Sequence, residues 1–396
     1  MRRYRPEVVT LEGRALLSAG PVATPRPNVL VGSANPTDHA AEQTLQSILN
    51  HTRIETGVPA LAGGIIIDGK LAATAASGVR IRGRAQPVTV ADQFNLGSVS
   101  KSMTATLAAI LVERQTLRWD TTVGQTFPEL RGKINPAYDN VTLRQLLDHR
   151  SGLPADEGLD PVLADKALAF RGPGPLARRQ FLAPILASAP ANPAGEMTYS
   201  NSGYVVAAAM IERATGLGYE GLMRKLIFGP LGMRSAGFGT PGQSQGHARP
   251  VQPSGHDEAG TPAGYGPLPA SPPLIDPAGG IFMNMNDWSK FLRMQMGERV
   301  NGVRLLSNAS RNALQTPDPR PIADQGGLLY GAGWVTVSTP LGTALWHNGT
   351  NGSWYAQQLL FPSKRAAVFV ATNQGGPRGD AAVGQAVSAL MARAFA

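Results

Sequence analysis

The spacing of apolar positions changes along the chain and divides it into helix-like and strand-like regions. Over 41–56 the apolar residues recur on one face of a helix, which predicts an N-terminal helix. Two largely apolar runs follow at 61–67 and 72–81, and Asp68-Gly69 between them is typical of a tight hairpin turn. The region after the helix therefore predicts a pair of antiparallel strands.

Patterns from about 119 to 274 are mainly helical and are separated by long loops. The C-terminal part returns to strand-like runs, and a last helix is expected near Asp380. These runs lie at 331–337, 343–346, 353–361 and 366–372. Because strands lie at both ends of the chain with helices between them, we expect an α/β (α+β) fold. Its antiparallel sheet would be built from both chain ends and flanked by helices, with a mostly helical inserted subdomain.

Composition limits the kinds of partner that this chain can have. The 396 residues carry a formal net charge of +9 and no cysteine, which excludes disulfides and thiolate chemistry. No apolar run approaches the roughly eighteen residues needed to cross a bilayer, so the sequence does not predict an integral membrane protein. Arg80, Arg82 and Arg84 alternate on one strand face, but no aromatic residues lie between them to stack on bases. Nucleic acid is therefore not an expected partner.

A hydroxyl and an amine lie three residues apart where an extended run gives way to a helix. Gly97 interrupts the extended run, and helical spacing begins directly after it. Ser98 and Lys101 therefore share a helix face, so that their side chains can meet. A serine beside an amine that has lost its proton is an activated nucleophile, and burial of the amine favours that loss. The alternative is that Ser98 is an ordinary helix cap, since Ser-x-x-Lys also arises by chance.

Two downstream segments make the chemical interpretation specific. They are Met-Thr-Tyr-Ser-Asn at 197–201 and Trp-His-Asn-Gly-Thr at 346–350. Together with Ser98 and Lys101, they resemble the Ser-x-x-Lys, Tyr-x-Asn and Lys/His-x-Gly motifs of the serine β-lactamase-like family, which includes class C β-lactamases, penicillin-binding esterases and D-peptidases. Further stretches that resemble the family lie at 94–104, 141–154 and 278–282. The resemblance covers roughly 41–396 and implies a serine hydrolase with the fold described above.

The resemblance implies catalytic roles for five residues. Ser98 would attack a carbonyl carbon, and either Lys101 or Tyr199 would take its proton. Asn201 would orient Lys101 or hydrogen-bond a substrate amide. His347 would assist the same network of hydroxyl groups from the third motif.

The same resemblance implies a site for the negative charge that develops on the substrate. The backbone N–H groups of Ser98 and Thr350 would form an oxyanion hole. Gly349 would let its strand approach the ligand closely. Asn348 and Gly349 are the expected substrate-binding residues.

His347 and Asn348 depart from the commoner form of the third motif. Many members of the family carry Lys at the first position and Thr or Ser at the second. A histidine with an ordinary pKa near 6.5 is mostly uncharged at neutral pH, so it attracts a substrate carboxylate less than lysine does. These changes slightly favour a carboxylesterase-like activity. The alternatives are a D-alanyl-D-alanine carboxypeptidase or D-aminopeptidase, a weak β-lactamase and, from another class, a catalytically inactive exported binding protein.

The first forty residues differ in composition from the rest of the chain. Glu12 and Arg14 interrupt the apolar run that a standard signal peptide needs. The sequence Leu-Glu-Gly-Arg-Ala-Leu-Leu-Ser-Ala at 11–19 instead resembles a segment found on exported proteins of planctomycete-type bacteria, which implies a secreted or cell-envelope protein. We expect an export or targeting segment and linker at 1–40, followed by one hydrolase domain at 41–396 that contains the helical insertion.

Glycine and proline are dense over 239–277, which predicts a long surface loop. In the family's architecture such a loop would lie near the cleft and shape substrate choice; the alternative is a linker without that role. We interpret His149 as structural, and the other histidines lack the spacing of metal ligands, so neither a metal nor another cofactor is expected. The expected partner is a small-molecule ester, D-peptide or β-lactam substrate. We expect a monomer, with association to the cell wall left open.

Overall fold

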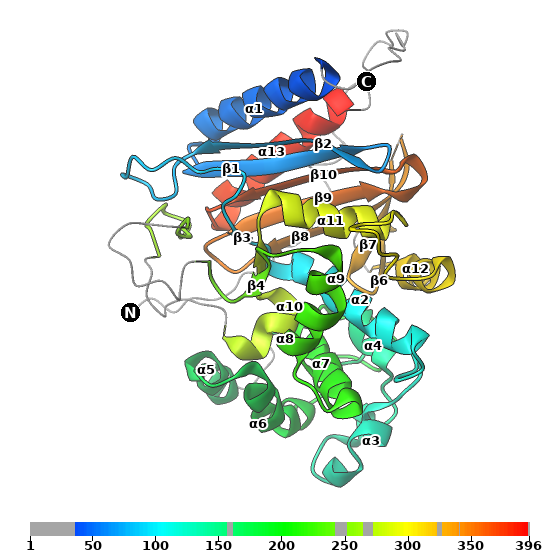
Figure 1. The fold of residues 1–396 in the computed structure, drawn as a ribbon. Helices are drawn as coiled ribbons and strands as arrows, with labels where there is room; N and C mark the ends of the chain where they lie inside the picture. The colour runs from blue at the N-terminus through cyan, green and yellow to red at the C-terminus, as the bar shows by residue number, and fades with distance from the viewer. Residues whose placement is uncertain are drawn as a thin grey trace.

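Strands from the two ends of the chain form one antiparallel sheet in the computed structural model, which describes residues 36–156, 161–241, 252–263, 272–322, 327–339 and 341–394. Within these residues the sheet has seven strands in the order β2-β1-β10-β9-β8-β7-β6 (Figure 1). The strands are β1 (Ala60–Ile67), β2 (Lys70–Gly78), β6 (Leu329–Gly331), β7 (Trp334–Thr339), β8 (Gly342–Thr350), β9 (Tyr355–Phe361) and β10 (Ala366–Thr372). Because β1 pairs with both β2 and β10, the predicted α/β (α+β) fold with a sheet built from both chain ends is confirmed.

Of two tight hairpin turns in the sheet, only the first was predicted from the sequence. Asp68 and Gly69 turn the chain between β1 and β2 with φ values of 50° and 74°, the left-handed backbone that the sequence predicts there. The run at 331–337, expected as one strand, is instead two strands. Ala332 and Gly333 turn the chain between β6 and β7 with φ values of 45° and 82°. Alanine seldom adopts this conformation, which explains why the turn was not predicted.

Helices from the two chain ends cover one face of the sheet. They are α1 (Pro36–Thr56) and α13 (Gly376–Ala394), which contact each other; in Figure 1 α1 lies above the sheet and α13 passes behind its strands. Both begin a few residues before the predicted starts. The side chains that they bury against the sheet include Leu45, Leu49, Val383 and Val387. These positions are four residues apart within each helix, so one apolar face docks each helix.

The other face of the sheet carries α11 (Met285–Gln295) and the start of α2 (Ser100–Glu113). Gln358 of β9 donates a hydrogen bond to Ser102 of α2 over 3.2 Å. Helix α2 is buried from Ser100 to Leu111, so it runs through the interior between the sheet and the remaining helices. A helix buried on all sides needs mostly small and apolar residues, as the sequence of α2 provides.

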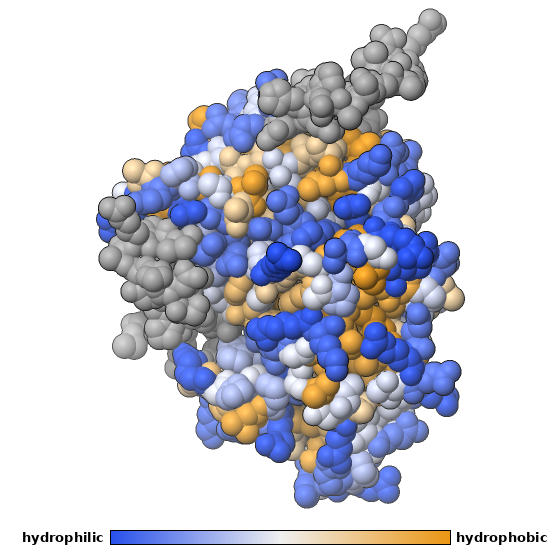
Figure 2. Space-filling model, viewed as in Figure 1, coloured by the Kyte–Doolittle hydropathy of each residue, from blue (hydrophilic) through white to orange (hydrophobic). Residues whose placement is uncertain are grey.

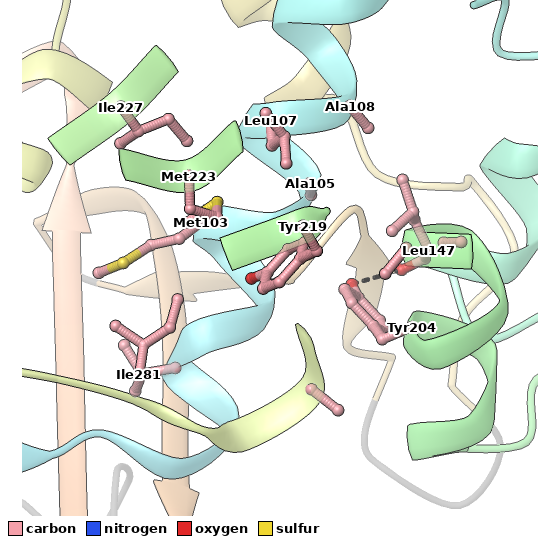
Figure 3. Packing of buried hydrophobic residues seen from close by; sticks show 14 of the residues in the cluster. Met103, Ala105, Leu107, Ala108, Leu147, Tyr204, Tyr219, Met223, Ile227 and Ile281 are labelled. Carbon is pink, nitrogen blue, oxygen red and sulfur yellow. Dashed lines mark hydrogen bonds between the residues drawn. The ribbon is translucent and has the colours of Figure 1, made fainter. Parts of the chain in front are cut away.

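The remaining helices lie mainly below α2 in the view of Figure 1. They are α3 (Val123–Thr126), α4 (Leu143–Leu147), α5 (Pro161–Ala169), α6 (Gly174–Leu186), α7 (Asn201–Thr215), α8 (Tyr219–Met223), α9 (Gly229–Leu231), α10 (Asp276–Gly279) and α12 (Asn308–Gln315). Met103 and Leu107 of α2 share one buried cluster with Tyr219 (Figure 3). In the same view the Tyr204 hydroxyl donates to the Leu147 carbonyl oxygen over 2.7 Å.

A small sheet leads the chain into α2. It has the order β3-β5-β4, with β3 at Phe94–Asn95, β5 at Ile281–Met283 and β4 at Gly237–Phe238. The backbone N–H of Leu96, directly after β3, donates to the Ile281 carbonyl oxygen over 2.9 Å. Segments far apart in the sequence thus fix the chain just before Ser98.

The Gly- and Pro-rich segment 239–277 lies only partly within the described residues. One described part, 252–263, contains no helix or strand, as predicted for a loop, but Ser254 and His256 are buried in it, so it does not lie wholly at the surface. The prediction is wrong at the C-terminal end, where α10 begins before Pro277. Proline is favoured in the first turn of a helix, because its missing N–H would have no partner there.

No helix within the described ranges has the length and apolar character needed to span a bilayer. Figure 2 shows hydrophilic and hydrophobic residues interspersed over the face seen in Figure 1. Of the predicted N-terminal segment at 1–40, residues 36–40 form the start of α1, and the remainder lies outside the described residues.

Candidate active site

Ser98 lies where the chain enters α2. It belongs to a 3-10 turn, η1 (Gly97–Val99), and α2 begins at Ser100. Gly97 has a φ of 51°, and its N–H donates to the Asn95 side chain over 2.9 Å, which fixes the entry to this turn. Ser98 is half-buried, whereas its neighbours on both sides are buried. Its hydroxyl therefore lies at the border of the interior.

Lys101 is completely buried and contacts three oxygen atoms. Its Nζ lies 2.9 Å from Ser98 Oγ, 2.6 Å from Asn201 Oδ1 and 2.8 Å from the Ala278 carbonyl oxygen. Burial lowers the pKa of Lys101 from 10.5 to about 7, against the opposing effect of the Asp156 charge. The amine is therefore available in its neutral form near neutral pH.

The three contacts of Lys101 determine what a neutral amine does in this place. A neutral amine has two N–H donors and one lone pair. Asn201 Oδ1 and the Ala278 carbonyl oxygen can only accept, so they take the two N–H groups. The lone pair is then left for Ser98, whose hydroxyl can donate its proton to Nζ. This arrangement can deprotonate the serine without any other side chain.

Tyr199 lies next to both of these groups. Its hydroxyl is hydrogen-bonded to Ser98, and Lys101 Nζ lies 4.9 Å from the centre of its ring. Burial raises the pKa of Tyr199 well above its ordinary value of 10, more than the hydrogen bond to Ser98 lowers it. His149 packs against the Tyr199 ring at 4.1 Å between centroids, and its Nδ1 accepts from the Ser200 N–H over 3.1 Å. His149 thus packs against the Tyr199 ring and holds the backbone next to it, which agrees with a structural role.

Asn201 connects Lys101 to a carboxylate. Its Oδ1 accepts from Lys101, and its Nδ2 donates to Asp156 Oδ2 over 2.6 Å. Asn201 is the first residue of α7, and Asp156 belongs to the segment that follows α4. Two separate elements therefore meet at the Lys101 amine.

The end of β8 lies against η1 through main chain alone. A Cβ atom on Gly349 would come under 3.0 Å from the Ser98 nitrogen, and one on Gly97 would come under 3.0 Å from the Thr350 nitrogen. Only glycine at both positions permits this approach. The backbone N–H groups of Ser98 and Thr350 are thereby brought to neighbouring positions, as a pair of oxyanion donors requires.

The His347 side chain lies on the face of the sheet that carries α2, and it is buried from solvent. Its Nε2 lies 3.2 Å from the Tyr330 hydroxyl, and its Nδ1 lies 2.5 Å from the Asn348 carbonyl oxygen. Because a carbonyl oxygen only accepts, Nδ1 carries the proton and Nε2 accepts from Tyr330. Burial and the neighbouring charge of Lys101 lower the pKa of His347 to about 3, so the imidazole is neutral at physiological pH.

The Asn348 side chain is not brought to Ser98. It donates through Nδ2 to the Tyr355 hydroxyl over 2.5 Å, and Tyr355 belongs to the cluster under α1 and α13. Neighbouring residues of a strand point to opposite faces of the sheet, so Asn348 points away from the face that carries His347. Ser98, Lys101, Tyr199, Asn201 and His347 are gathered in one place, and so are the backbones of Gly349 and Thr350.

Three groups in this site were not predicted from the sequence. They are the Asp156 carboxylate, the Ala278 carbonyl oxygen and the Tyr330 hydroxyl. Asp156 lies two residues after the family-like stretch that ends at residue 154, and Ala278 lies within another such stretch. Their positions could therefore be linked to the family from the sequence, although their contacts could not. In the parts of the chain that the structure describes, no three His, Asp or Glu side chains gather in a way that could hold a metal ion.

Comparison with known proteins finds similarity over most of the chain. The model of the family described as Beta-lactamase matches residues 39–392. Penicillin-binding protein 4 of Amycolatopsis lactamdurans is 29% identical over 348 residues, which cover 86% of each chain. D-aminopeptidase of Cereibacter sphaeroides is 28% identical over 203 residues, which are 50% of this chain but only 36% of that protein.

A solved structure supports the fold independently. The octameric penicillin-binding protein homologue from Pyrococcus abyssi superposes with a TM-score of 0.71 at 25% identity. The match covers 88% of this chain and 77% of that one. The fold of most of this chain is therefore shared with that homologue.

Proposed function

The chain belongs to the β-lactamase family of serine hydrolases, and we propose that Ser98 is the nucleophile through which it cleaves an ester or amide bond. The observation that carries this proposal is the position of the buried Lys101 amine, 2.9 Å from Ser98 Oγ with its other two partners both acceptors. A hydroxyl that can pass its proton to such an amine is an activated nucleophile.

The proposed reaction forms and then hydrolyses an acyl-enzyme. Ser98 Oγ attacks the carbonyl carbon while its proton moves to Lys101 Nζ. The backbone N–H groups of Ser98 and Thr350 stabilise the oxyanion that forms. As this intermediate collapses, the bond to the leaving group breaks and the leaving group takes the proton from Lys101. Water then attacks the ester of Ser98, which releases the acid and restores the serine.

We assign the base to Lys101 rather than to Tyr199. The pKa of Lys101 is lowered to about 7, so a large fraction of the amine is neutral at physiological pH. The pKa of Tyr199 is raised, so its phenolate is scarce there. In this account Tyr199 stays protonated and hydrogen-bonds Ser98, and Asn201 orients Lys101.

A carboxylic ester is the preferred substrate class in this proposal. His347 has its pKa lowered to about 3 and is neutral, and the Asn348 amide is engaged by Tyr355 on the other face of the sheet. Neither side chain offers the charge or hydrogen bond that would anchor a substrate carboxylate. A substrate without a carboxylate near the scissile bond does not need such an anchor, so its binding is weakened least.

A second candidate is a D-peptidase or a weak β-lactamase. The names of the relatives favour it, since they include a penicillin-binding protein and a D-aminopeptidase. The ratio of kcat/KM values for a short-chain ester, a D-alanyl-D-alanine peptide and a cephalosporin distinguishes the candidates. We expect the ester to have the highest value; faster turnover of the cephalosporin or the peptide would overturn the ester preference.

Labelling by a fluorophosphonate tests the nucleophile separately from the substrate. We expect one covalent adduct on Ser98 in the folded full-length protein and none in Ser98→Ala. An unlabelled Ser98 in folded protein would favour the binding-protein alternative.

Export to the cell envelope or medium and a monomeric state complete the proposal. The resemblance of residues 11–19 to a segment of exported proteins supports export, which detection of the protein outside the cytoplasm would test. The homologue from Pyrococcus abyssi is octameric, so the mass in solution decides whether this chain is a monomer.

A further inference from the structure

A carboxylate stands at the end of a chain of hydrogen bonds that leads to Ser98. Asp156 Oδ2 accepts from Asn201 Nδ2 over 2.6 Å, and Asn201 Oδ1 accepts from Lys101 Nζ over 2.6 Å. Lys101 Nζ in turn lies 2.9 Å from Ser98 Oγ. Asp156 is half-buried and holds the Asn201 amide, which in turn holds Lys101, so it can orient the Asn201 side chain.

Rotating an asparagine amide by half a turn exchanges its oxygen and its NH₂ group with almost no change of shape. If the Asn201 amide were turned, its NH₂ group would face the Lys101 amine, and its oxygen would face the Asp156 carboxylate. Two donors would then oppose each other, and so would two acceptors. The Asp156 carboxylate accepts from Asn201 in only one of the two orientations. We propose that Asp156 is a positioning residue, which holds the Asn201 amide with its oxygen towards Lys101 and so directs the Lys101 lone pair to Ser98.

The charge of Asp156 has a second consequence at Lys101. Burial lowers the pKa of the amine, and the Asp156 carboxylate opposes that effect. The other groups that face Lys101 are the rings of Tyr199 and Tyr204, at 4.9 and 5.4 Å, together with His149 and His347. Burial lowers the pKa values of both histidines and raises those of both tyrosines, so these four side chains are neutral near pH 7. Asp156 is thus the charged partner of Lys101 in this set.

Because Asp156 acts through Lys101, its role rests on the proposed function, and the test includes a measurement that needs no turnover. Three full-length variants are compared with the wild type: Asp156→Asn, Asp156→Ala and the control Glu196→Gln. Glu196 is an exposed carboxylate three residues before Tyr199, so its loss removes a nearby charge without touching the chain of hydrogen bonds. The measurements are the pH dependence of kcat/KM for p-nitrophenyl acetate and an NMR titration of the Lys101 side chain labelled with ¹³C.

The two Asp156 variants separate charge from orientation. Asp156→Asn retains an acceptor for Asn201 but loses the charge, so the pKa of Lys101 and the acidic limb of the profile should both move about 1 unit lower, with the plateau little changed. Asp156→Ala should show the same shift and a plateau about tenfold lower, because the Asn201 amide loses its partner. Glu196→Gln should match the wild type.

Wild-type profiles and a wild-type plateau in folded Asp156→Ala would overturn the role of Asp156. An unmoved Lys101 titration in both Asp156 variants would overturn the effect of the Asp156 charge on Lys101, whether or not the ester is a substrate. Equal hydrolysis by the wild type and Ser98→Ala would instead contradict the proposed function, and the NMR titration would still show whether the Asp156 charge acts on Lys101.

Discussion

The main chain of Gly349 lies so close to Ser98 that a Cβ atom on Gly349 would come under 3.0 Å from the Ser98 nitrogen. The Leu96 carbonyl oxygen would be equally near. Strand β8 and the turn before α2 therefore meet through backbone atoms, with no side chain between them. The separation of the two proposed oxyanion donors depends on this contact.

Replacing Gly349 by alanine should force the strand and the turn apart. We expect kcat for an ester to fall by about 10²–10³, the usual effect of losing one oxyanion donor. Overpacking should also lower the free energy of unfolding by about 1–3 kcal/mol. Thr350→Ser is the matched control, because it keeps both the backbone N–H and a hydroxyl, and its kcat should stay near the wild-type value. A folded Gly349→Ala variant with wild-type kcat would contradict the proposed oxyanion hole.

The rate of acylation should depend on the protonation of Lys101. A base must be unprotonated to accept the serine proton, so kcat/KM should rise with pH and reach half its plateau near pH 7, where Lys101 titrates. Ester hydrolysis measured from pH 5 to 9 tests this expectation. A rate that is flat over that range would argue against Lys101 as the base.

His347 should not contribute to that pH dependence. Its pKa is lowered to about 3, so it stays neutral over the whole range in which the rate is measured. In His347→Gln we therefore expect a limb with the same midpoint near pH 7, even if the plateau falls. If the limb disappears from the profile of this variant, the titrating group is His347 and not Lys101.

Burial of Lys101 should also be visible in the pH dependence of stability. Its pKa is about 7 in the folded protein and 10.5 as its ordinary value, so between these values the unfolded chain binds more protons. The free energy of unfolding should then rise by about 1.4 kcal/mol per pH unit from this group between pH 7 and 10. Below pH 7 the cost of the buried amine is greatest.

Lys101→Met removes this contribution, because methionine does not titrate. We expect the variant to gain stability over the wild type at pH 6, and the gain to shrink as pH approaches 10. Urea unfolding at pH 6, 8 and 9.5 measures the difference. A constant difference across these values would mean that the pKa of Lys101 is not lowered by folding.

Local spacing explains why part of the site could be predicted from the sequence. Ser98 and Lys101 are three residues apart at a helix start, so helix geometry alone brings them together. The hairpin at Asp68 and Gly69 is likewise a local turn with residues suited to it. The resemblance to a known family added the distant Tyr199.

Contacts between segments far apart in the sequence, and contacts made by backbone atoms, could not be predicted from local spacing. Asp156 and Asn201 are 45 residues apart, and the Ala278 carbonyl oxygen is 177 residues from Lys101. A carbonyl oxygen is present in every residue, so no residue type marks it. The Asn348 side chain is different, since strand alternation alone puts it on the face opposite His347.

The most direct test of the central claim is hydrolysis of a short-chain p-nitrophenyl ester by the full-length wild type, Ser98→Ala and Ser188→Ala, a half-buried serine that donates to the Ile185 carbonyl oxygen. We predict turnover by the wild type and Ser188→Ala, its loss in Ser98→Ala, and an acyl group on Ser98 by mass spectrometry. Equal turnover by all three proteins, or none by any, would contradict the assignment of Ser98 as the nucleophile for ester hydrolysis.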